Sequence, residues 1–176
     1  EYLIEQLQTE QHGASKSQNL NFNHPVKELI WVIQDADAAS GATSNIDATL
    51  NVDGTVSNKN DFFCYSSPTS NSESIYGASQ NESFGTAKLQ INGHDRFAVR
   101  HRNYFTRTQV YQHHSGFGGV TVKDSIAVYS FALKPEEHQP SGTCNFSRID
   151  NARLEHGNNG QAINIYAVNY NVLRIM

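Results

Sequence analysis

The stretch NLNFNHPVKELIWVIQ, residues 19–34, decides the fold because two burial patterns meet in it. Its first part alternates polar and apolar residues, which predicts a half-buried strand with Leu20 and Phe22 facing a core. Beyond Pro25 both faces become apolar, and Trp31 lies in the middle of that run. A strand that is apolar on both faces is covered on both sides. The stretch therefore predicts a layered β structure with a buried strand.

Alternating stretches recur along the chain and outnumber helical patterns. The clearest is NIDATLNVDG, residues 45–54, which ends in an Asp-Gly turn signal. The last is INIYAVNYNVLRI, residues 163–175, whose apolar face changes near Asn169 to Asn171 and so predicts a β-bulge. The other predicted strands are 2–8, 86–92, 119–123, 125–133, 143–149 and 151–156. Eight or nine strands separated by Gly, Pro, Asn and Ser indicate a sandwich or a barrel.

Two segments depart from this pattern. Residues 64–83 are rich in serine and poor in large aliphatic residues, which predicts an exposed loop. Residues 95–109 have apolar and aromatic side chains at helical spacing, which predicts one short amphipathic helix. The predicted inner face of this helix consists of Phe97, His101, Tyr104, Phe105 and Thr108.

Composition limits the functional classes. A length of 176 residues fits one domain. The formal net charge of −4 and only 13 Lys and Arg residues give no basic surplus, so no direct binding of nucleic acid is expected. No apolar run approaches the length of a transmembrane helix, so no transmembrane segment is expected. Cys64 and Cys144 lack the spacing of a zinc site and are predicted to be free thiols. The only methionine is Met176, so the chain is expected to be a fragment of a longer polypeptide.

No recognisable constellation for catalysis is present. The eight histidines include no His-x-His pair, and the adjacent His113 and His114 would point to opposite faces of a strand. The acidic pairs fall in predicted loops, and no Gly-x-Ser-x-Gly motif occurs. The sequence therefore predicts no catalytic residue, no metal site and no cofactor, which makes an enzyme the less favoured class. Carboxylates that meet in space from distant strands are left open.

Two weaker patterns involve charge and glycosylation. A basic cluster beside the predicted helix suits an anion or an acidic patch on a neighbouring subunit, but a solvated helix face is the favoured interpretation. The cluster consists of Arg96, Arg100, Arg102 and Arg107. The triplets that begin at Asn81 and Asn145 match the glycosylation sequon, a pattern that also arises by chance.

The stretch YSFALKPEEHQPSGTCNFSRIDNARL, residues 129–154, resembles the signature near the C-terminus of the major capsid proteins of nucleocytoplasmic large double-stranded DNA viruses. Residues 20–34, RNYFTRTQVYQHHSG at 102–116 and the closing INIYAVNYNVLRIM are similar to further parts of that family, in the same order. Residues 35–83 do not match and resemble the variable surface loops of its members.

The resemblance implies an all-β fold, an eight-stranded antiparallel jelly-roll sandwich with one short helix and a long surface loop. Residues 1–176 would form one jelly-roll domain, the C-terminal half of a double jelly-roll capsid protein, with 35–83 as a variable strand-and-loop region within it. The implied function is structural: a late viral protein that forms homotrimeric, pseudo-hexagonal capsomers in an icosahedral virion. The implied partners are copies of the intact protein, neighbouring capsomers and minor capsid proteins, with assembly in the host cytoplasm.

The connection KPEEHQPSG within 130–150 is the candidate subunit contact. Pro135 cannot donate a hydrogen bond to a ladder, Pro140 fixes φ, and Gly142 allows the chain to reverse, which predicts a stiff loop. A loop that is ordered before contact loses less entropy on docking. An equally open interpretation is that the loop only secures the turn between two strands. The candidate interface residues are Lys134, Pro135, Glu136, Glu137, His138, Pro140, Arg148 and Asp150.

Two alternatives of other classes remain at this stage. A carbohydrate-binding jelly-roll module would expose Tyr or Trp on a sheet face, whereas Trp31 lies in a run that is apolar on both sides. A cupin-like enzyme would need a metal cluster, and the spacing of the histidines argues against one.

Overall fold

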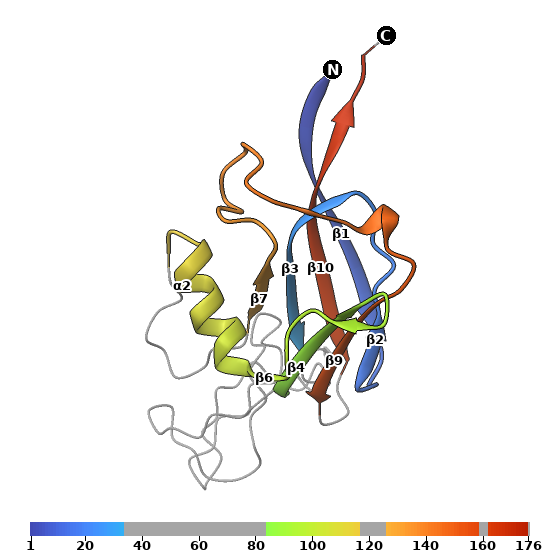
Figure 1. Cartoon of the computed structure of the whole chain (residues 1–176), viewed down its shortest axis with the longest axis vertical. Helices are drawn as coiled ribbons and strands as arrows, with labels where there is room; N and C mark the ends of the chain where they lie inside the picture. Colours follow the sequence, from blue (N-terminus) through green and yellow to red (C-terminus); the bar gives the residue numbers. More distant parts are fainter. Residues whose placement is uncertain (34–83, 117–125, 159–161, 176) are drawn as a thin grey trace, which may run out of the picture.

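The computed structural model describes residues 1–33, 84–116, 126–158 and 162–175. Within these residues two antiparallel sheets face each other (Figure 1). The first sheet contains β1 (Tyr2–His12), β10 (Ile163–Leu173), β3 (Pro25–Ile33), β7 (Ala127–Ser130) and β8 (Cys144–Asn145). The second sheet contains β2 (Ser17–Asn19), β9 (Ala152–Asn158), β4 (Phe84–Ile91), β5 (His94–Asp95) and β6 (Arg100–His101). The helical elements are the π-helical turn η1 (Tyr104–Thr108), α2 (Gln109–His113) and the 3-10 turn η2 (Phe146–Arg148).

The ten strands of the described residues fill eight strand positions, four in each sheet. β5 and β6 pair in turn with β4, on the edge that β9 leaves open. β7 and β8 likewise pair in turn with β3, on the edge opposite β10. With the order β1-β10-β3-β7 in one sheet and β2-β9-β4-β5 in the other, most connections cross between the sheets, as in a jelly roll; the exceptions are β4 to β6, which share the second sheet, and β7 to β8, which share the first. The expected antiparallel jelly-roll sandwich is therefore confirmed.

The core lies between the sheets and is centred on β3. Leu29, Trp31 and Ile33 are each 1% exposed, so the prediction of a buried Trp31 is confirmed. The ring of Trp31 packs against Phe105, with 5.1 Å between centroids. The first part of β3 is also buried away from these residues, where the Lys27 side chain contacts Pro135 in the connection that follows β7 and Glu28 contacts His114 after α2.

β1 and β10 form a long ribbon that projects beyond the rest of the first sheet and carries both ends of the chain (Figure 1). The pairing of β10 with β3 shifts between Val168 and Asn169, which agrees with the bulge predicted near Asn169 to Asn171. Asn169 is fully buried there, and its side-chain amide donates to the carbonyl of Asn23 at 3.1 Å.

The strand predicted over residues 19–23 is wrong in its position, although Leu20 and Phe22 are buried as expected. β2 ends at Asn19, and although the Leu20 amide still donates to the Ala152 carbonyl of β9, the amides of Asn21 and Asn23 bond to side chains of β1. Asn21 N–H donates to the Glu10 carboxylate at 3.0 Å, and Asn23 N–H donates to the Gln8 amide oxygen at 2.9 Å. β1 continues to His12 rather than ending at residue 8 because it pairs with β10 along its whole length.

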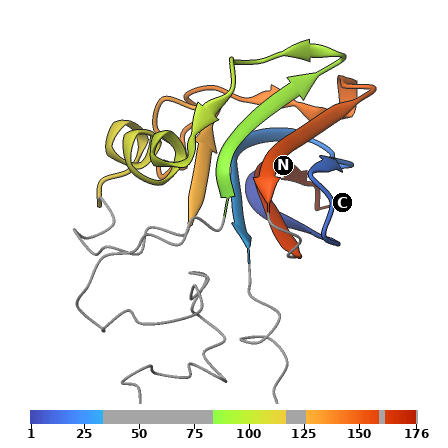
Figure 2. The same ribbon diagram turned by 90° about the horizontal axis from the view of Figure 1, so that it is seen from below.

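The helix predicted over 95–109 is displaced toward the C-terminus. Residues 94–101 contain β5 and β6, and the helical turns run over 104–113, beside β7 at the edge of the first sheet (Figures 1 and 2). Phe97 still joins the core, because its ring lies 4.8 Å from that of Tyr129 and 5.5 Å from that of Phe105. Phe97 and Phe105 therefore have helical spacing in the sequence without sharing a helix. Phe97 lies in the loop between β5 and β6, and this loop reaches the same aromatic cluster.

The strand predicted over 143–149 is also shorter than expected. β8 ends at Asn145, whose side-chain oxygen accepts a hydrogen bond from Ser147 N–H at 3.1 Å and so begins η2. The strands predicted at 45–54 and 119–123, and the whole of the variable region 35–83, lie outside the described residues.

Candidate subunit-contact site

The candidate interface loop, residues 134–142, leaves β7 and returns toward β8, between α2 and the β1–β10 ribbon (Figure 1). Its two ends are joined through Ser141. Lys134 N–H donates to the Ser141 hydroxyl at 2.9 Å, and the hydroxyl donates to the Lys134 carbonyl at 3.2 Å. These bonds close the loop at its base without a regular ladder, as expected for a segment that contains Pro135.

Gly142 is required at the end of this loop. Its φ is +145°, in the region that favours glycine. A Cβ atom at this position would lie 2.8 Å from the carbonyl oxygen of Phe131, so a side chain would also displace the backbone. The prediction that Gly142 allows the chain to reverse thus has a direct structural basis.

Lys27 anchors the loop to the first sheet. Its side chain is 2% exposed, and Nζ donates to the Pro135 carbonyl at 2.7 Å and to the Glu5 carboxylate at 2.7 Å. The same ammonium lies 5.1 Å from the centre of the Tyr170 ring, whose hydroxyl donates to the His138 carbonyl at 3.3 Å. A buried ammonium needs such partners because its desolvation is costly. Two points of the loop backbone are therefore fixed by β3 and β10.

His114 anchors the loop on its other side. Its Nε2 lies 3.0 Å from the Glu28 carboxylate on β3, and its Nδ1 lies 3.2 Å from the Glu136 carboxylate on the loop. Ser115 N–H donates to the other oxygen of Glu136 at 2.9 Å. Burial raises the pKa of Glu28, whereas the hydrogen bonds from Ser115 and the nearby His114 lower the pKa of Glu136. We call this group of side chains the His114 bridge.

The remaining interface candidates divide between the loop and the segment after it. Glu137 is exposed and pairs with Lys134 at 3.0 Å. His138 is 66% exposed, and its Nδ1 lies 3.5 Å from Glu5. Pro135 is buried, whereas Pro140 is exposed. The exposed loop residues thus stand on a backbone that the sheet holds in place.

Arg148, the last residue of η2, and Asp150, on the connection from η2 to β9, are both exposed. Asp150 N–H donates to the Asn92 side chain at 3.0 Å, so its backbone braces the turn between β4 and β5. In the described part of the chain no ion pair joins Arg148 to Asp150. Their place in a subunit contact stays a prediction.

The four arginines of the basic cluster do not share one environment. Arg102 is 4% exposed, whereas Arg96, Arg100 and Arg107 are exposed. The guanidinium of Arg100 lies over the Tyr104 ring at 5.3 Å. A surface patch from this cluster would therefore contain three of the four residues.

The two sequons differ in what the structure says about them. Asn145 is exposed, and its side-chain oxygen bonds to Ser147 N–H, the amide of the sequon serine itself. Asn81 lies outside the described residues, as does Cys64. Cys144 is a half-buried free cysteine, and burial raises the pKa of its thiol.

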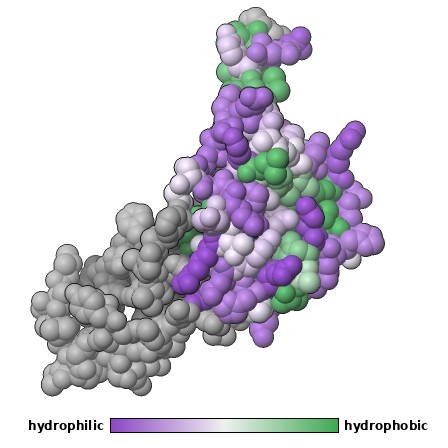
Figure 3. Space-filling view, turned by 60° about the vertical axis from the view of Figure 1, so that its left-hand side comes forward, coloured by the Kyte–Doolittle hydropathy of each residue, from purple (hydrophilic) through white to green (hydrophobic). Residues whose placement is uncertain are grey.

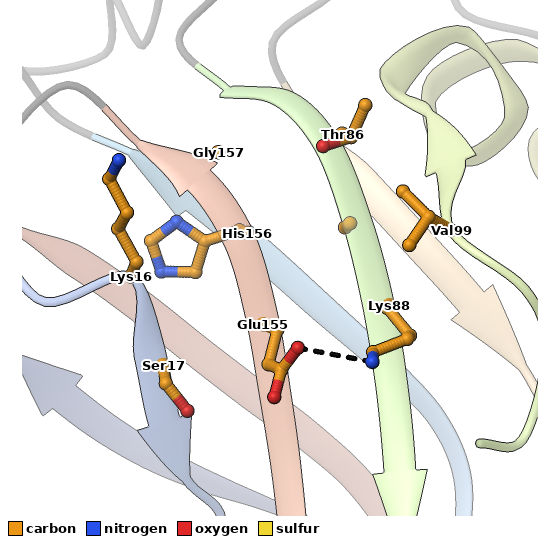
Figure 4. Close-up of a pocket in the computed structure, with 9 residues that line it drawn as sticks. Lys16, Ser17, Thr86, Lys88, Val99, Glu155, His156 and Gly157 are labelled. Carbon is orange, nitrogen blue, oxygen red and sulfur yellow. Dashed lines mark ion pairs between the residues drawn. The ribbon is translucent and has the colours of Figure 1, made fainter.

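A shallow cleft of about 300 Å³ lies over the second sheet (Figure 4). Across it Lys88 pairs with Glu155 at 3.2 Å. The cleft is lined by Lys16, Ser17, Thr86, Ala87, Lys88, Val99, Glu155, His156 and Gly157. This lining has no Tyr, Trp or Phe on which a sugar ring would stack, and Trp31 is buried in the core. The cleft therefore gives no support to the carbohydrate-binding alternative.

Within the described ranges, no three His, Cys, Asp or Glu side chains are placed to hold a metal ion together. Over the same ranges, none of the helices has the length and apolar character needed to cross a membrane.

The comparisons with known proteins agree with this architecture. The model of the family described as large eukaryotic DNA virus major capsid protein matches residues 1–176. The chain belongs to this family. The major capsid protein of Pyramimonas orientalis virus is 41% identical over all of the chain, and that of Paramecium bursaria Chlorella virus 1 is 40% identical.

Solved structures place this capsid protein chain in the same fold. It matches a chain of the PBCV-1 virus capsid with a TM-score of 0.69 and 35% identity over 99% of its length. The Faustovirus major capsid protein, at 13% identity and a TM-score of 0.66, shares the fold. The chain covers 41% and 46% of the two viral relatives and 49% of the PBCV-1 chain, so it spans about half of their length or less.

Sequence reasoning found the loop but not what holds it. Lys27, Glu28 and His114 were not among the candidates. One signal was available: Lys27 and Glu28 are adjacent charged residues at the start of the strand that is apolar on both faces. Charged residues in a buried strand need partners, although the sequence does not say which.

Proposed function

We propose that this chain is the C-terminal jelly roll of a viral major capsid protein that assembles as homotrimeric, pseudo-hexagonal capsomers in an icosahedral shell. The observation that carries the proposal is the family match over residues 1–176, together with 35% identity to a PBCV-1 capsid chain over 99% of this chain. The intact protein, neighbouring capsomers and minor capsid proteins would be its partners, with assembly in the host cytoplasm. The role is structural, as it is throughout the family.

The loop at 134–142 is the proposed contact between subunits. Its backbone is held by Lys27, Tyr170 and the His114 bridge, while Lys134, Glu137 and His138 point their side chains to solvent. Such a surface loses little conformational entropy on association, so more of the contact energy appears as affinity.

Light scattering over a concentration series tests the assembly step on the longer double jelly-roll protein. We expect the mass of a trimer. Glu137→Arg is expected to lower the trimer fraction, because it reverses an exposed charge at the proposed contact. Asp95→Arg is the matched control, since Asp95 is an exposed carboxylate that also pairs with a lysine, on the opposite sheet.

Monomers of the unsubstituted protein at all concentrations would overturn the capsomer proposal. If the unsubstituted protein is a trimer and Glu137→Arg and Asp95→Arg change the trimer fraction equally, the capsomer proposal stands but the loop is not part of the subunit interface. The same measurement on residues 1–176 alone shows whether this jelly roll carries enough of the contact to associate by itself.

A further inference from the structure

The His114 bridge has an unusual arrangement of hydrogen-bonding groups. Both nitrogens of one imidazole face carboxylate oxygens, Glu28 at 3.0 Å and Glu136 at 3.2 Å. A carboxylate only accepts hydrogen bonds, so each nitrogen must carry a proton if both carboxyl groups are ionised. A neutral imidazole has one N–H and therefore satisfies only one of the two contacts.

The bridge must accordingly hold one proton more than a neutral histidine between two ionised glutamates. The extra proton is either on the His114 ring, which becomes an imidazolium, or on Glu28. The surroundings favour its retention. Glu28 is 8% exposed, and its burial raises its pKa. The charged neighbours of the bridge are Lys27, which pairs with Glu5, and the Lys134–Glu137 pair; His113, the next titratable group, faces the Leu133 carbonyl.

The two arms of the bridge differ in how easily they open. Glu28 is buried on β3 and is much less exposed than Glu136, so a neutral His114 would keep its one N–H directed at Glu28. Its Nδ1 lone pair would then face the Glu136 carboxylate, which is a repulsive contact between two acceptors. Glu136 is 43% exposed and lies on the loop, so this arm can turn to solvent.

We propose that the His114 bridge is a proton-dependent latch, which holds the Glu136 side of the 134–142 loop against α2 and releases it when the shared proton is lost at higher pH. The Lys27 anchor does not depend on that proton and keeps the Pro135 end of the loop in place. The latch therefore changes the order of the loop and not the fold. This inference concerns contacts within the chain and does not rest on the proposed function.

The sign of the pH effect follows from the three groups. Because the pKa of Glu28 is raised, the proton-bound bridge is most stable at low pH and is lost as the pH rises. Because the pKa of Glu136 is lowered, its contacts persist until the pH falls below the ordinary range of a glutamate. The His114 bridge thus holds the loop over a range of pH. At the alkaline end of that range the shared proton is released and the loop is freed.

Nuclear magnetic resonance of the 176-residue chain counts the protons directly. At about pH 6 we expect either both His114 nitrogens protonated, from their ¹⁵N shifts, or a single protonated nitrogen with a protonated Glu28, from its ¹³C carboxyl shift. A neutral His114 together with an ionised Glu28 at that pH would overturn the proposal.

Amide exchange of Ser115, which donates to Glu136, reports the latch itself. Relative to the intrinsic rate at each pH, its protection is expected to fall about tenfold between about pH 6 and about pH 9, the effect of losing a charge-assisted hydrogen bond. His113→Gln is the matched control, because His113 is next to His114 in the sequence and its ring lies against the Leu133 backbone carbonyl and not against a carboxylate of the bridge. It should retain the fall in protection.

Two substitutions separate a proton-dependent latch from an ordinary structural contact. In Glu28→Gln the side-chain amide can donate to Nε2 of a neutral His114, which leaves the Nδ1–H for Glu136. Protection of Ser115 should then change by less than about twofold over the same pH range. His114→Gln should give low protection at both ends of the range. If Glu28→Gln instead kept the pH dependence of the unsubstituted chain, the shared proton would not be the cause.

Discussion

At the scale of single residues, His156 combines deep burial with a titratable ring. It is 4% exposed on β9, and neither ring nitrogen has a hydrogen-bond partner in the described part of the protein. Burial, with a smaller contribution from His12, lowers its pKa from 6.5 to about 4. His156 is therefore neutral in the folded protein at neutral pH. Replacing His156 with an apolar side chain of similar size would therefore break no hydrogen bond seen in the described part of the protein.

His156 should make the fold sensitive to acid. Since its folded-state pKa lies below that of the unfolded chain, protonation favours unfolding, and stability falls as the pH falls from about 6.5 toward about 4. The loss is at most roughly 3–4 kcal/mol, at about 1.4 kcal/mol for each pKa unit between 6.5 and about 4. His156→Leu should flatten this part of the profile in urea unfolding measured between about pH 4 and about pH 7. His94→Leu, at an exposed site, is the control; an unchanged profile in His156→Leu would contradict this account.

At the scale of elements, the fold depends on contacts that fasten one connection to a sheet. The 134–142 loop is not paired with a strand along its length, yet Lys27 on β3, Tyr170 on β10 and His114 after α2 each hold it. A loop without such contacts would be ordered only by its prolines. The stiffness that the sequence predicts from Pro135 and Pro140 is thus reinforced by partners from three separate elements.

Lys27→Met should detach the Pro135 end of this loop. Methionine fills a similar volume but donates no hydrogen bond to the Pro135 carbonyl, and it leaves Glu5 without its cation. We expect a loss of roughly 1–3 kcal/mol in the free energy of unfolding, measured by urea titration, and faster proteolysis within 134–142. Lys134→Met is the control, because Lys134 is 67% exposed and an exposed ion pair contributes little. Equal effects of the two substitutions would show that Lys27 is not an anchor.

At the scale of the whole molecule, stability should be distributed unevenly along the β1–β10 ribbon. The centre of β10 pairs with β1 on one side and β3 on the other, and Ile163, Ile165 and Ala167 are fully buried. The projecting end exposes Tyr2, Leu3, Val172 and Leu173, and Figure 3 shows apolar residues near that end on an otherwise mainly hydrophilic face. Few buried contacts therefore hold the end of the ribbon.

Hydrogen exchange should reveal this difference in one experiment. Amides in the centre of β3 and β10 should exchange only through global unfolding, roughly a thousandfold or more slower than those of Leu3 and Val172 at the projecting end. Uniform protection along the ribbon would show that its end is as stable as the core. The same exchange map on the longer protein would reveal any additional partner of the ribbon, as increased protection at its end.

The sequence by itself determined the class of the fold and the family. Apolar residues on one face or on both faces of a strand report which faces are buried, and this is why Trp31, the doubly covered β3 and the bulge at Asn169 could be predicted without coordinates. Most strand positions followed in the same way. The strand predicted at 19–23 is displaced and the one predicted at 143–149 is shorter. In both segments backbone amides donate to side-chain oxygens of Gln8, Glu10 or Asn145 instead of to a neighbouring strand.

Only the tertiary structure decided what holds the candidate site. Lys27 meets Pro135 across 108 residues of sequence, and His114 meets Glu28 across 86. Periodicity cannot supply such pairs, because it records the burial of a residue and not its partner. The helix predicted at 95–109 lies at 104–113 for the same reason. The spacing of Phe97 suggested a helical face, but Phe97 reaches the core from a loop. Local patterns determine the strands, whereas their packing determines which distant charges become neighbours.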